Sequence, residues 1–333
     1  MLRIVAALLG IAILLPACGG TSDDSAEAGS DGAKLTLVAY STPREVYAQL
    51  TKDFAKTPEG QGVSFDESYG SSGEQSRAVE AGLAADVVAF SLAPDVDRLV
   101  EAGMVEESWA DDEHGGMVTN SVVVFAVRKG NPKGIKTWDD LVKDGVEVIE
   151  PNPFTSGGAR WNVMAAYGAQ MKQAKSHLEG VEYLHELFKH VSVQDKSARE
   201  SLQTFTGGKG DVLLAYENEA ILAQEKGEEL DYVVPDQTIL IENPVAAIST
   251  GENVETAQAF LDYLRGGEAQ TAFGEAGYRP VVETVAMKLG FPKPAQLFTI
   301  EQLGGWDVVQ KKFFDREDGI MADIQREVGA DLE

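Results

Sequence analysis

Short apolar runs rich in β-branched residues recur along the chain, and stretches with helical spacing lie between most of them. A run of this length and composition predicts a buried strand, and its alternation with helices predicts an α/β fold around a largely parallel sheet. We assign strands to 35–40, 86–90, 121–127, 146–150, 211–216, 232–234 and 245–248. The sequence shows no internal repeat of roughly 20 to 50 residues, which excludes a solenoid.

The N-terminal segment has the pattern of a targeting signal. Arg3 is followed by an apolar run that ends in Leu14-Leu15-Pro16-Ala17-Cys18. The run has roughly 14 apolar residues, whereas a membrane span needs about 20. A small residue directly before a cysteine resembles the lipobox of bacterial lipoproteins, so we expect 1–17 to be a signal peptide and Cys18 to be lipidated. The alternative is an ordinary signal peptide with an incidental cysteine.

Residues 18–32 are expected to form a disordered tether, because Gly19 to Gly32 include no aromatic or β-branched aliphatic residue. About 300 residues follow, enough for one large or two medium domains. Acyl chains on Cys18 would hold this folded part at the outer face of a membrane without spanning it.

Charge and histidine spacing exclude two kinds of partner. The formal net charge of −26 repels nucleic acid at long range, so we expect no nucleic-acid partner. The histidines lack the spacing of metal ligands, so we expect no metal site and no cofactor. They are His114, His177, His185 and His190.

Four predicted helices begin with a hydroxyl residue. The capping-box pairs are Thr42 with Glu45, Ser72 with Gln75 and Ser197 with Glu200, and Ser156 is a candidate N-cap before Gly157-Gly158. One interpretation is that each cap only closes its own helix. The other is that several helix N-termini converge and bind an anion with their unpaired N–H groups. The two glycines favour convergence, since a ligand can approach a backbone without Cβ atoms closely.

Several segments resemble the sulfate-binding proteins of bacterial ABC importers, the sulfate/thiosulfate substrate-binding lipoprotein family. They are TPREVY (42–47), GSSGEQSRAV (70–79), LAADVVAFSL (83–92), VFAVRKGNPKGIKTWDDLV (124–142), PNPFTSGGARWNVMAA (151–166), GDVLLAYENEA (210–220) and RP (279–280). The similarity extends over nearly the whole chain after the signal segment.

The resemblance implies a two-lobed, periplasmic-binding-protein-like (type II) fold with a ligand cleft between the lobes. One lobe would comprise 33–119 plus 244–333 and the other 120–243, with crossovers near Asn120 and Asn243. Backbone N–H groups at helix starts and a few side chains would bind a dehydrated sulfate. The residues that the resemblance places at the ligand are Ser41, Ser72, Ser156, Gly157, Gly158, Ala198 and Tyr216.

Two of these positions depart from the family pattern. Ser41 stands where the family usually has Asp, and Tyr216 stands where it usually has a Trp that donates its indole N–H to sulfate. Donors alone suit sulfate, which carries no proton at neutral pH, and they reject hydrogenphosphate. A phenol both donates and accepts, so thiosulfate, molybdate and tungstate stay open as alternative ligands.

The resulting hypothesis is a binding protein without enzymatic activity that captures sulfate and delivers it to ABC permease subunits. We expect a monomer on the extracytoplasmic face of the cell membrane, attached by its lipid anchor alone. The remote alternative is a secreted serine hydrolase that uses Ser156, although the sequence has no G-x-S-x-G motif. In the binding protein, Gly157→Val is expected to abolish binding and leave the fold intact, because the added carbons would occupy the ligand's approach.

Overall fold

The computed structural model describes residues 32–332, so Cys18, the predicted signal peptide 1–17 and tether residues 18–31 lie outside the described residues. The strands are β1 Lys34–Tyr40, β2 Ser64–Gly70, β3 Val87–Ala89, β4 Met117–Arg128, β5 Val148–Ile149, β6 Val191–Val193, β7 Val212–Tyr216, β8 Leu230–Val233, β9 Gln237–Ala247, β10 Arg279–Pro280 and β11 Gln296–Phe298. The α-helices are α1 Arg44–Phe54, α2 Ser72–Glu80, α3 Ala93–Glu101, α4 Gly157–Lys172, α5 His177–His190, α6 Ala198–Thr206, α7 Glu217–Glu225, α8 Val254–Arg265, α9 Gly267–Glu275, α10 Glu283–Leu289, α11 Gly305–Phe313 and α12 Ile320–Val328. Within 32–332, no helix combines the length and the apolar character that a membrane crossing requires.

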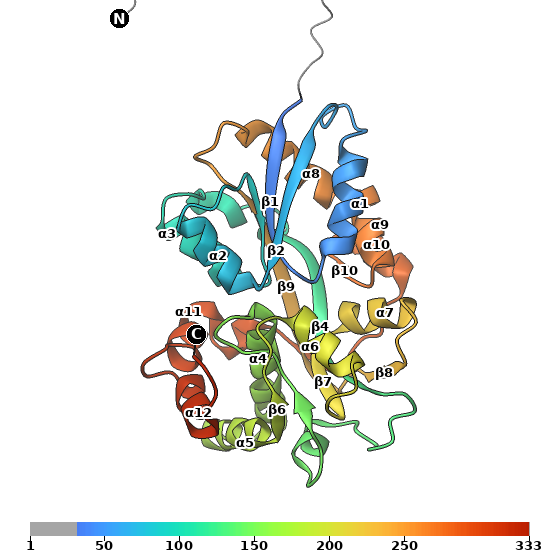
Figure 1. The fold of residues 1–333 in the computed structure, drawn as a ribbon, viewed down its shortest axis with the longest axis vertical. Coiled ribbons are helices and arrows are strands. Elements are labelled where there is room, and N and C mark those ends of the chain that lie inside the picture. The colour runs from blue at the N-terminus through green and yellow to red at the C-terminus, as the bar shows by residue number, and fades with distance from the viewer. Residues whose placement is uncertain (1–31, 333) are drawn as a thin grey trace, which may run out of the picture. The chain divides into compact units, whose positions relative to one another are not determined.

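The predicted α/β fold is confirmed, and its strands and helices form two lobes (Figure 1). Lobe 1 contains β1 to β3, α1 to α3 and α8 to α10, and lobe 2 contains β5 to β8 and α4 to α7. In lobe 1, the predicted apolar face of α1 packs with β1 and α8 in one cluster, through Val46, Leu50 and Phe54. In lobe 2, α4 is buried along nearly its whole length and forms the centre of the core.

Each lobe is built on parallel strand pairs. β1 pairs in parallel with β2 and β3, and β5 pairs in parallel with β6 and β7. Because helices follow the carboxyl ends of these strands, their N-termini face the region where the two lobes meet. Strand β2 was missed in the sequence because its residues SFDESYG are mostly polar, which an edge strand tolerates.

Two long strands, β4 and β9, pass from one lobe to the other. They pair antiparallel, and β9 also pairs with β3 of lobe 1 while β4 pairs with β7 of lobe 2. Thr119 lies opposite Asn243 in this ladder, and its hydroxyl donates to Asn243 Oδ1 over 3.3 Å. The two segments expected to contain the crossovers are therefore neighbours at the junction of the lobes.

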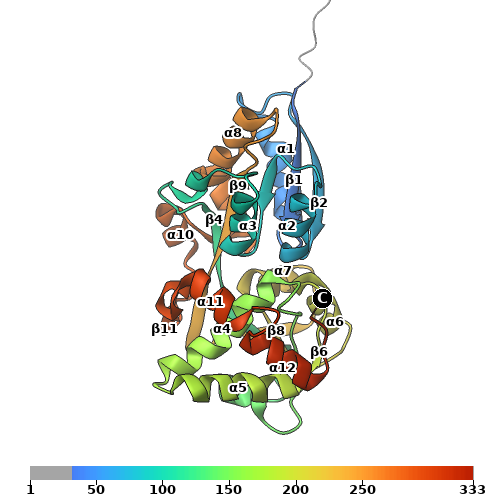
Figure 2. The same cartoon turned by 90° about the vertical axis from the view of Figure 1, so that its left-hand side faces the viewer.

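The C-terminal segment packs with lobe 2. Apolar side chains from β11, α11 and α12 belong to the same cluster as those of α4 and α5, among them Phe298, Phe313 and Ile324. Figure 2 shows α11 and α12 beside α4 and α5. The sequence-based prediction placed all of 244–333 in lobe 1, whereas the last part of this segment packs in the core of lobe 2. Local sequence pattern does not show which core the final helices contact.

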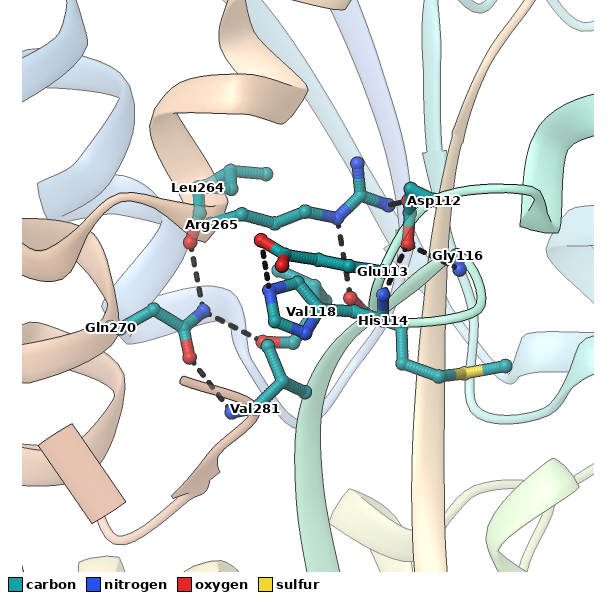
Figure 3. A network of polar contacts seen from close by, with 10 residues as sticks. Asp112, Glu113, His114, Gly116, Val118, Leu264, Arg265, Gln270 and Val281 are labelled. Atoms are coloured by element: carbon teal, nitrogen blue, oxygen red, sulfur yellow. Dashed lines mark hydrogen bonds and ion pairs between the residues drawn. The ribbon is translucent and has the colours of Figure 1, made fainter. Parts of the chain in front are cut away.

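The side chain of Gln270 connects the start of β4 with α8 and with the backbone at Val281 (Figure 3). The side chain is fully buried, and its Nε2 donates to the carbonyl oxygens of Val118 and Leu264 over 2.8 Å each. Its Oε1 accepts from the N–H of Val281 over 2.9 Å. Arg265 next to it donates to the Met117 carbonyl and pairs with Asp112. These polar groups fix the strand that leads into the junction.

Gln270→Ala should lower the free energy of unfolding by roughly 2 to 4 kcal/mol, because it leaves three buried backbone groups without their partner and creates a cavity. Chemical denaturation measures the change. Gln258→Ala is the control, since the Gln258 side chain lies exposed on α8 and hydrogen-bonds Asp262, and it should cost less than about 0.5 kcal/mol. Equal losses in the two variants would contradict this role of Gln270.

Candidate anion-binding site

A cavity lies between the lobes at the carboxyl ends of their strands. The space between its lining atoms, which includes space open to solvent, is about 240 Å³. It is lined by Tyr40, Ser41, Thr42, Gly70, Ser71, Ser72, Ser91, Ser156, Gly157, Gly158, Ser197, Ala198 and Tyr216. All seven residues that the sequence placed at the ligand are among them. Their role as ligands stays a prediction.

Backbone N–H groups at the starts of three helices border this cavity. Ser72 begins α2, Gly157 and Gly158 begin α4, and Ala198 begins α6. Within the described part of the chain, none of these four N–H groups has a hydrogen-bond partner. Unpaired N–H groups at helix N-termini carry the positive end of the helix dipole, so this wall is suited to an anion.

The hydroxyl groups of Ser72 and Ser156 are used differently. Ser72 Oγ donates to the carboxylate of buried Asp95 over 2.6 Å and accepts from the N–H of Ser91 over 3.0 Å. This hydroxyl is therefore occupied within lobe 1, and Ser72 offers the cavity its N–H. Ser156 Oγ accepts from the N–H of Ala159 over 3.3 Å, which leaves its hydrogen available to the cavity.

Two of the predicted helix caps are confirmed and two are wrong. Ser156 and Ser197 cap α4 and α6 as predicted, but the box with Glu200 is incomplete because Glu200 accepts from the N–H of Lys196. Helix α1 starts at Arg44 with no side-chain cap, because Glu45 binds residues of lobe 2 instead of completing a capping box with Thr42. Helix α2 likewise has no side-chain cap, and its N-cap is Ser71.

Tyr216 lies on the floor of the cavity as a neutral phenol. Its hydroxyl oxygen is 2.6 Å from Ser91 Oγ, across the boundary between the lobes. Burial raises the pKa of this phenol well above its usual range. The side chain therefore supplies a hydroxyl hydrogen at every physiological pH.

Among residues 32–332, none of those that line the cavity carries a charged side chain. The lining contains serine, threonine, glycine, alanine and tyrosine, with neither a carboxylate nor a basic group. No histidine lines it either, and residues 32–332 contain no group of three or more His, Cys, Asp and Glu that could hold a metal ion. An anion here would be held by hydrogen-bond donors and helix dipoles without a countercharge in direct contact.

An ion-pair group joins the lobes beside the cavity. Arg199 of α6 donates from Nε to the carbonyl of Ser41 over 3.0 Å, and its Nη atoms bind the Glu45 carboxylate. Lys226, just after α7, binds the same carboxylate over 2.7 Å. Partial burial opposes the charge on Glu45, but the hydrogen bonds from Arg199 and Lys226 outweigh it and lower the pKa to about 2. Glu45 is therefore ionised at neutral pH and connects the two lobes.

Ser91 is the lining residue that matters most among those the sequence did not single out. It lies two residues after β3, beyond the carboxyl end of a parallel strand, and is 1% exposed. The rule that ligands meet such strand ends could have indicated it. Its contacts come from segments far away in sequence, which no local pattern reveals.

A larger hollow on lobe 1, which is open to solvent, does not suit an anion. Its lining includes the carboxylates of Glu106, Asp112, Glu113, Asp262 and Glu283, and none of the seven predicted residues. The single arginine there, Arg265, pairs with Asp112. The chemistry of the walls therefore favours the smaller cavity between the lobes.

Two α/β lobes around a cavity of unpaired N–H and hydroxyl donors define a solute-binding protein. The chain belongs to the family of bacterial extracellular solute-binding proteins, whose model matches residues 35–279. It is 42% identical over 313 residues to the sulfate-binding protein of Synechococcus elongatus, covering 91% of this chain and 89% of that one. It is 36% identical over 296 residues to the thiosulfate-binding protein of Pseudomonas aeruginosa, covering 84% and 89%. The solved structure of the sulfate-binding protein SubI from Mycobacterium tuberculosis H37Rv superimposes with a TM-score of 0.83 at 42% identity, covering 85% of this chain and 100% of that one.

Gly157→Ala should weaken binding of sulfate, the probe suggested by these names, by roughly 10- to 100-fold, since overpacking costs about 1 to 3 kcal/mol. An added Cβ would lie 2.5 Å from Leu92 Cδ2 and 2.8 Å from Ser91 Cβ. Both neighbours belong to lobe 1, so the added carbon would hold the lobes apart. The sequence analysis expected a different reason, namely that the added carbons would occupy the ligand's approach. Isothermal titration calorimetry measures the affinity.

Gly267→Ala is the matched control for Gly157→Ala. Gly267 is also the first residue of a helix, α9, and a Cβ there would meet no atom within 4 Å. This variant should bind as the unmodified protein does. An unchanged affinity in Gly157→Ala would show that the close approach of Gly157 to lobe 1 does not matter for binding.

Proposed function

We propose that the protein captures sulfate in the cavity between its lobes and delivers it to an ABC importer. The observation that carries this proposal is the wall of unpaired N–H groups and hydroxyls without any carboxylate. Sulfate accepts hydrogen bonds with all its oxygens and donates none, so each donor finds an acceptor. Hydrogenphosphate would turn its proton toward a donor, and such a mismatch costs roughly 1 to 3 kcal/mol when buried.

The strongly negative chain does not prevent anion binding. Surface charges are screened beyond about 8 Å at physiological salt, whereas hydrogen-bond donors act at about 3 Å. Each hydrogen bond to a charged group contributes roughly 1.5 to 3 kcal/mol. Several local donors therefore outweigh the repulsion of distant carboxylates.

A hydrolase that uses Ser156 finds no support in the geometry. The Ser156 Oγ accepts from a helix N–H and has no histidine base beside it. The histidines hydrogen-bond or pair elsewhere: His114 with Glu113, His177 with Tyr167, His185 with Glu327 and His190 with the Val146 carbonyl. A triad requires nucleophile and base in contact.

The attachment and the lobe limits belong to the same proposal. We assign 33–119 plus 244–290 to lobe 1 and 120–243 plus 296–332 to lobe 2, with closure about the β4 and β9 strands. The protein would act as a monomer, held by a lipid on Cys18 at the outer face of the cell membrane near its permease. An acyl mass on the peptide that begins at Cys18 tests the anchor, and a free thiol there in protein from cells would contradict it.

Titration calorimetry of the purified protein with sulfate, thiosulfate, molybdate, tungstate and hydrogenphosphate tests the ligand. Sulfate should bind with micromolar affinity or better, equivalent to about −8 kcal/mol, and hydrogenphosphate at least tenfold more weakly. Thiosulfate is the second candidate, because the chain is 36% identical to a thiosulfate-binding protein and Tyr216 stands where the sulfate-binding family usually has Trp. A silent sulfate titration beside a strong molybdate signal would refute the assignment to sulfate.

A further inference from the structure

Glu150 and Asn162 form a buried polar pair in lobe 2. Glu150 directly follows β5 and is 0% exposed, and Asn162 on α4 is 1% exposed. The Nδ2 of Asn162 donates to Glu150 Oε2 over 3.1 Å and to the carbonyl oxygen of Leu214 over 3.0 Å. The pair therefore connects the end of β5 with helix α4 and strand β7.

These three elements carry much of the lobe 2 part of the cavity wall. The segment after Glu150 leads to Ser156, helix α4 begins at Gly157, and strand β7 ends at Tyr216. Glu150 and Asn162 are not among the residues that line the cavity. Their hydrogen bonds therefore act on the site only through the backbone elements that they hold together.

Two oxygen atoms of the pair have no hydrogen-bond partner. Glu150 Oε1 and Asn162 Oδ1 are both buried and unpartnered among residues 32–332. Exchanging the oxygen and nitrogen of the Asn162 amide does not help, because its NH₂ group must face the Leu214 carbonyl, which can only accept. If Glu150 is ionised, both oxygens are acceptors and neither supplies a hydrogen. A proton on Glu150 Oε1 provides the missing donor.

The surroundings of Glu150 also disfavour a carboxylate. Its side-chain partner is the neutral amide of Asn162, and Arg160, near the start of α4, binds the Pro153 carbonyl and Gln310 instead. Burial is the main cause that raises the pKa of Glu150 well above its usual range. The hydrogen bond from Asn162 opposes this shift of the pKa, and the charge of Glu219 on α7 adds to it.

We propose that Glu150 is a neutral carboxylic acid that donates its proton to Asn162 Oδ1, and that this acid–amide pair positions the lobe 2 wall of the site. One carboxyl hydrogen and one amide hydrogen then join the two side chains, and both unpartnered oxygens are satisfied. The lobe that would bind the anion gains no negative charge from Glu150. The positioning part of this inference rests on the proposed binding of sulfate.

Chemical denaturation without ligand, from about pH 5.5 to about pH 7.5, tests the protonation of Glu150. In an unfolded chain a glutamate ionises near about pH 4.3, whereas the folded Glu150 keeps its proton, so stability falls as the pH rises. The unfolding equilibrium constant of the unmodified protein should rise about tenfold per pH unit relative to that of Glu150→Gln, whose amide supplies a donor at every pH. An equal pH dependence in the two proteins would overturn the neutral acid.

Glu182→Gln is the matched control for Glu150→Gln. Glu182 is also in lobe 2, but it lies exposed on α5, so this substitution removes a carboxylate that water solvates. The unfolding equilibrium constant of this variant, relative to the unmodified protein, should stay constant within about twofold over the same pH range. A pH dependence like that expected for Glu150→Gln would overturn the assignment of the effect to Glu150.

Titration calorimetry with sulfate at about pH 7 tests the positioning role, with thermal denaturation to show that the variants fold. Glu150→Gln should bind sulfate within about twofold of the unmodified protein, because its amide keeps both hydrogen bonds to Asn162. Glu150→Leu should bind at least about fivefold more weakly, because it leaves the Asn162 amide without this partner and α4 less firmly held.

Two results would overturn the positioning role: an unchanged sulfate affinity in Glu150→Leu, or a loss of affinity in Glu150→Gln as large as that in Glu150→Leu. An unmodified protein that binds no sulfate would instead refute the proposed function. The denaturation experiment needs no ligand, so it decides the protonation of Glu150 in either case.

Discussion

Unpaired backbone N–H groups at buried helix starts are the constraint on which the rest of the structure depends. The N–H groups of Ser72, Gly157, Gly158 and Ala198 border one cavity and have no partner among residues 32–332. A buried donor without an acceptor costs roughly 1 to 3 kcal/mol. Bringing these donors together is therefore unfavourable by itself, and an anion that accepts from all four groups would remove this cost.

Side chains of the two lobes also contact each other directly. The Glu45 carboxylate binds Arg199 and Lys226, and Ser91 of lobe 1 meets Trp161 and Tyr216 of lobe 2. These contacts fix the geometry of the donors once the lobes meet. Ser91 and Tyr216 line the cavity, whereas Glu45, Arg199 and Lys226 do not. An anion bound there would touch neutral donors, and the ion pairs would remain outside the site.

Local sequence pattern predicted those features of the fold and of the candidate site that depend on local structure. The α/β alternation, the helix caps at Ser156 and Ser197 and the glycine pair at the start of α4 are all present. The capping boxes predicted at Thr42 and Ser72 are wrong. Glu45 binds Arg199 and Ser72 binds Asp95, and both partners are distant in sequence. Ser91 was overlooked for the same reason. The sequence-based prediction placed the C-terminal helices in lobe 1, but they pack in the core of lobe 2. Spacing within a helix does not reveal the core against which the helix packs.

A crystal structure of the protein with sulfate, with anomalous data to locate sulfur, tests the central claim most directly. The account predicts one sulfate in the interlobe cavity, with oxygens about 3 Å from the N–H groups of Gly157, Gly158 and Ala198. No carboxylate should touch the anion. Sulfate bound outside this cavity, or a cavity that stays free of sulfate at saturating concentration, would contradict the account.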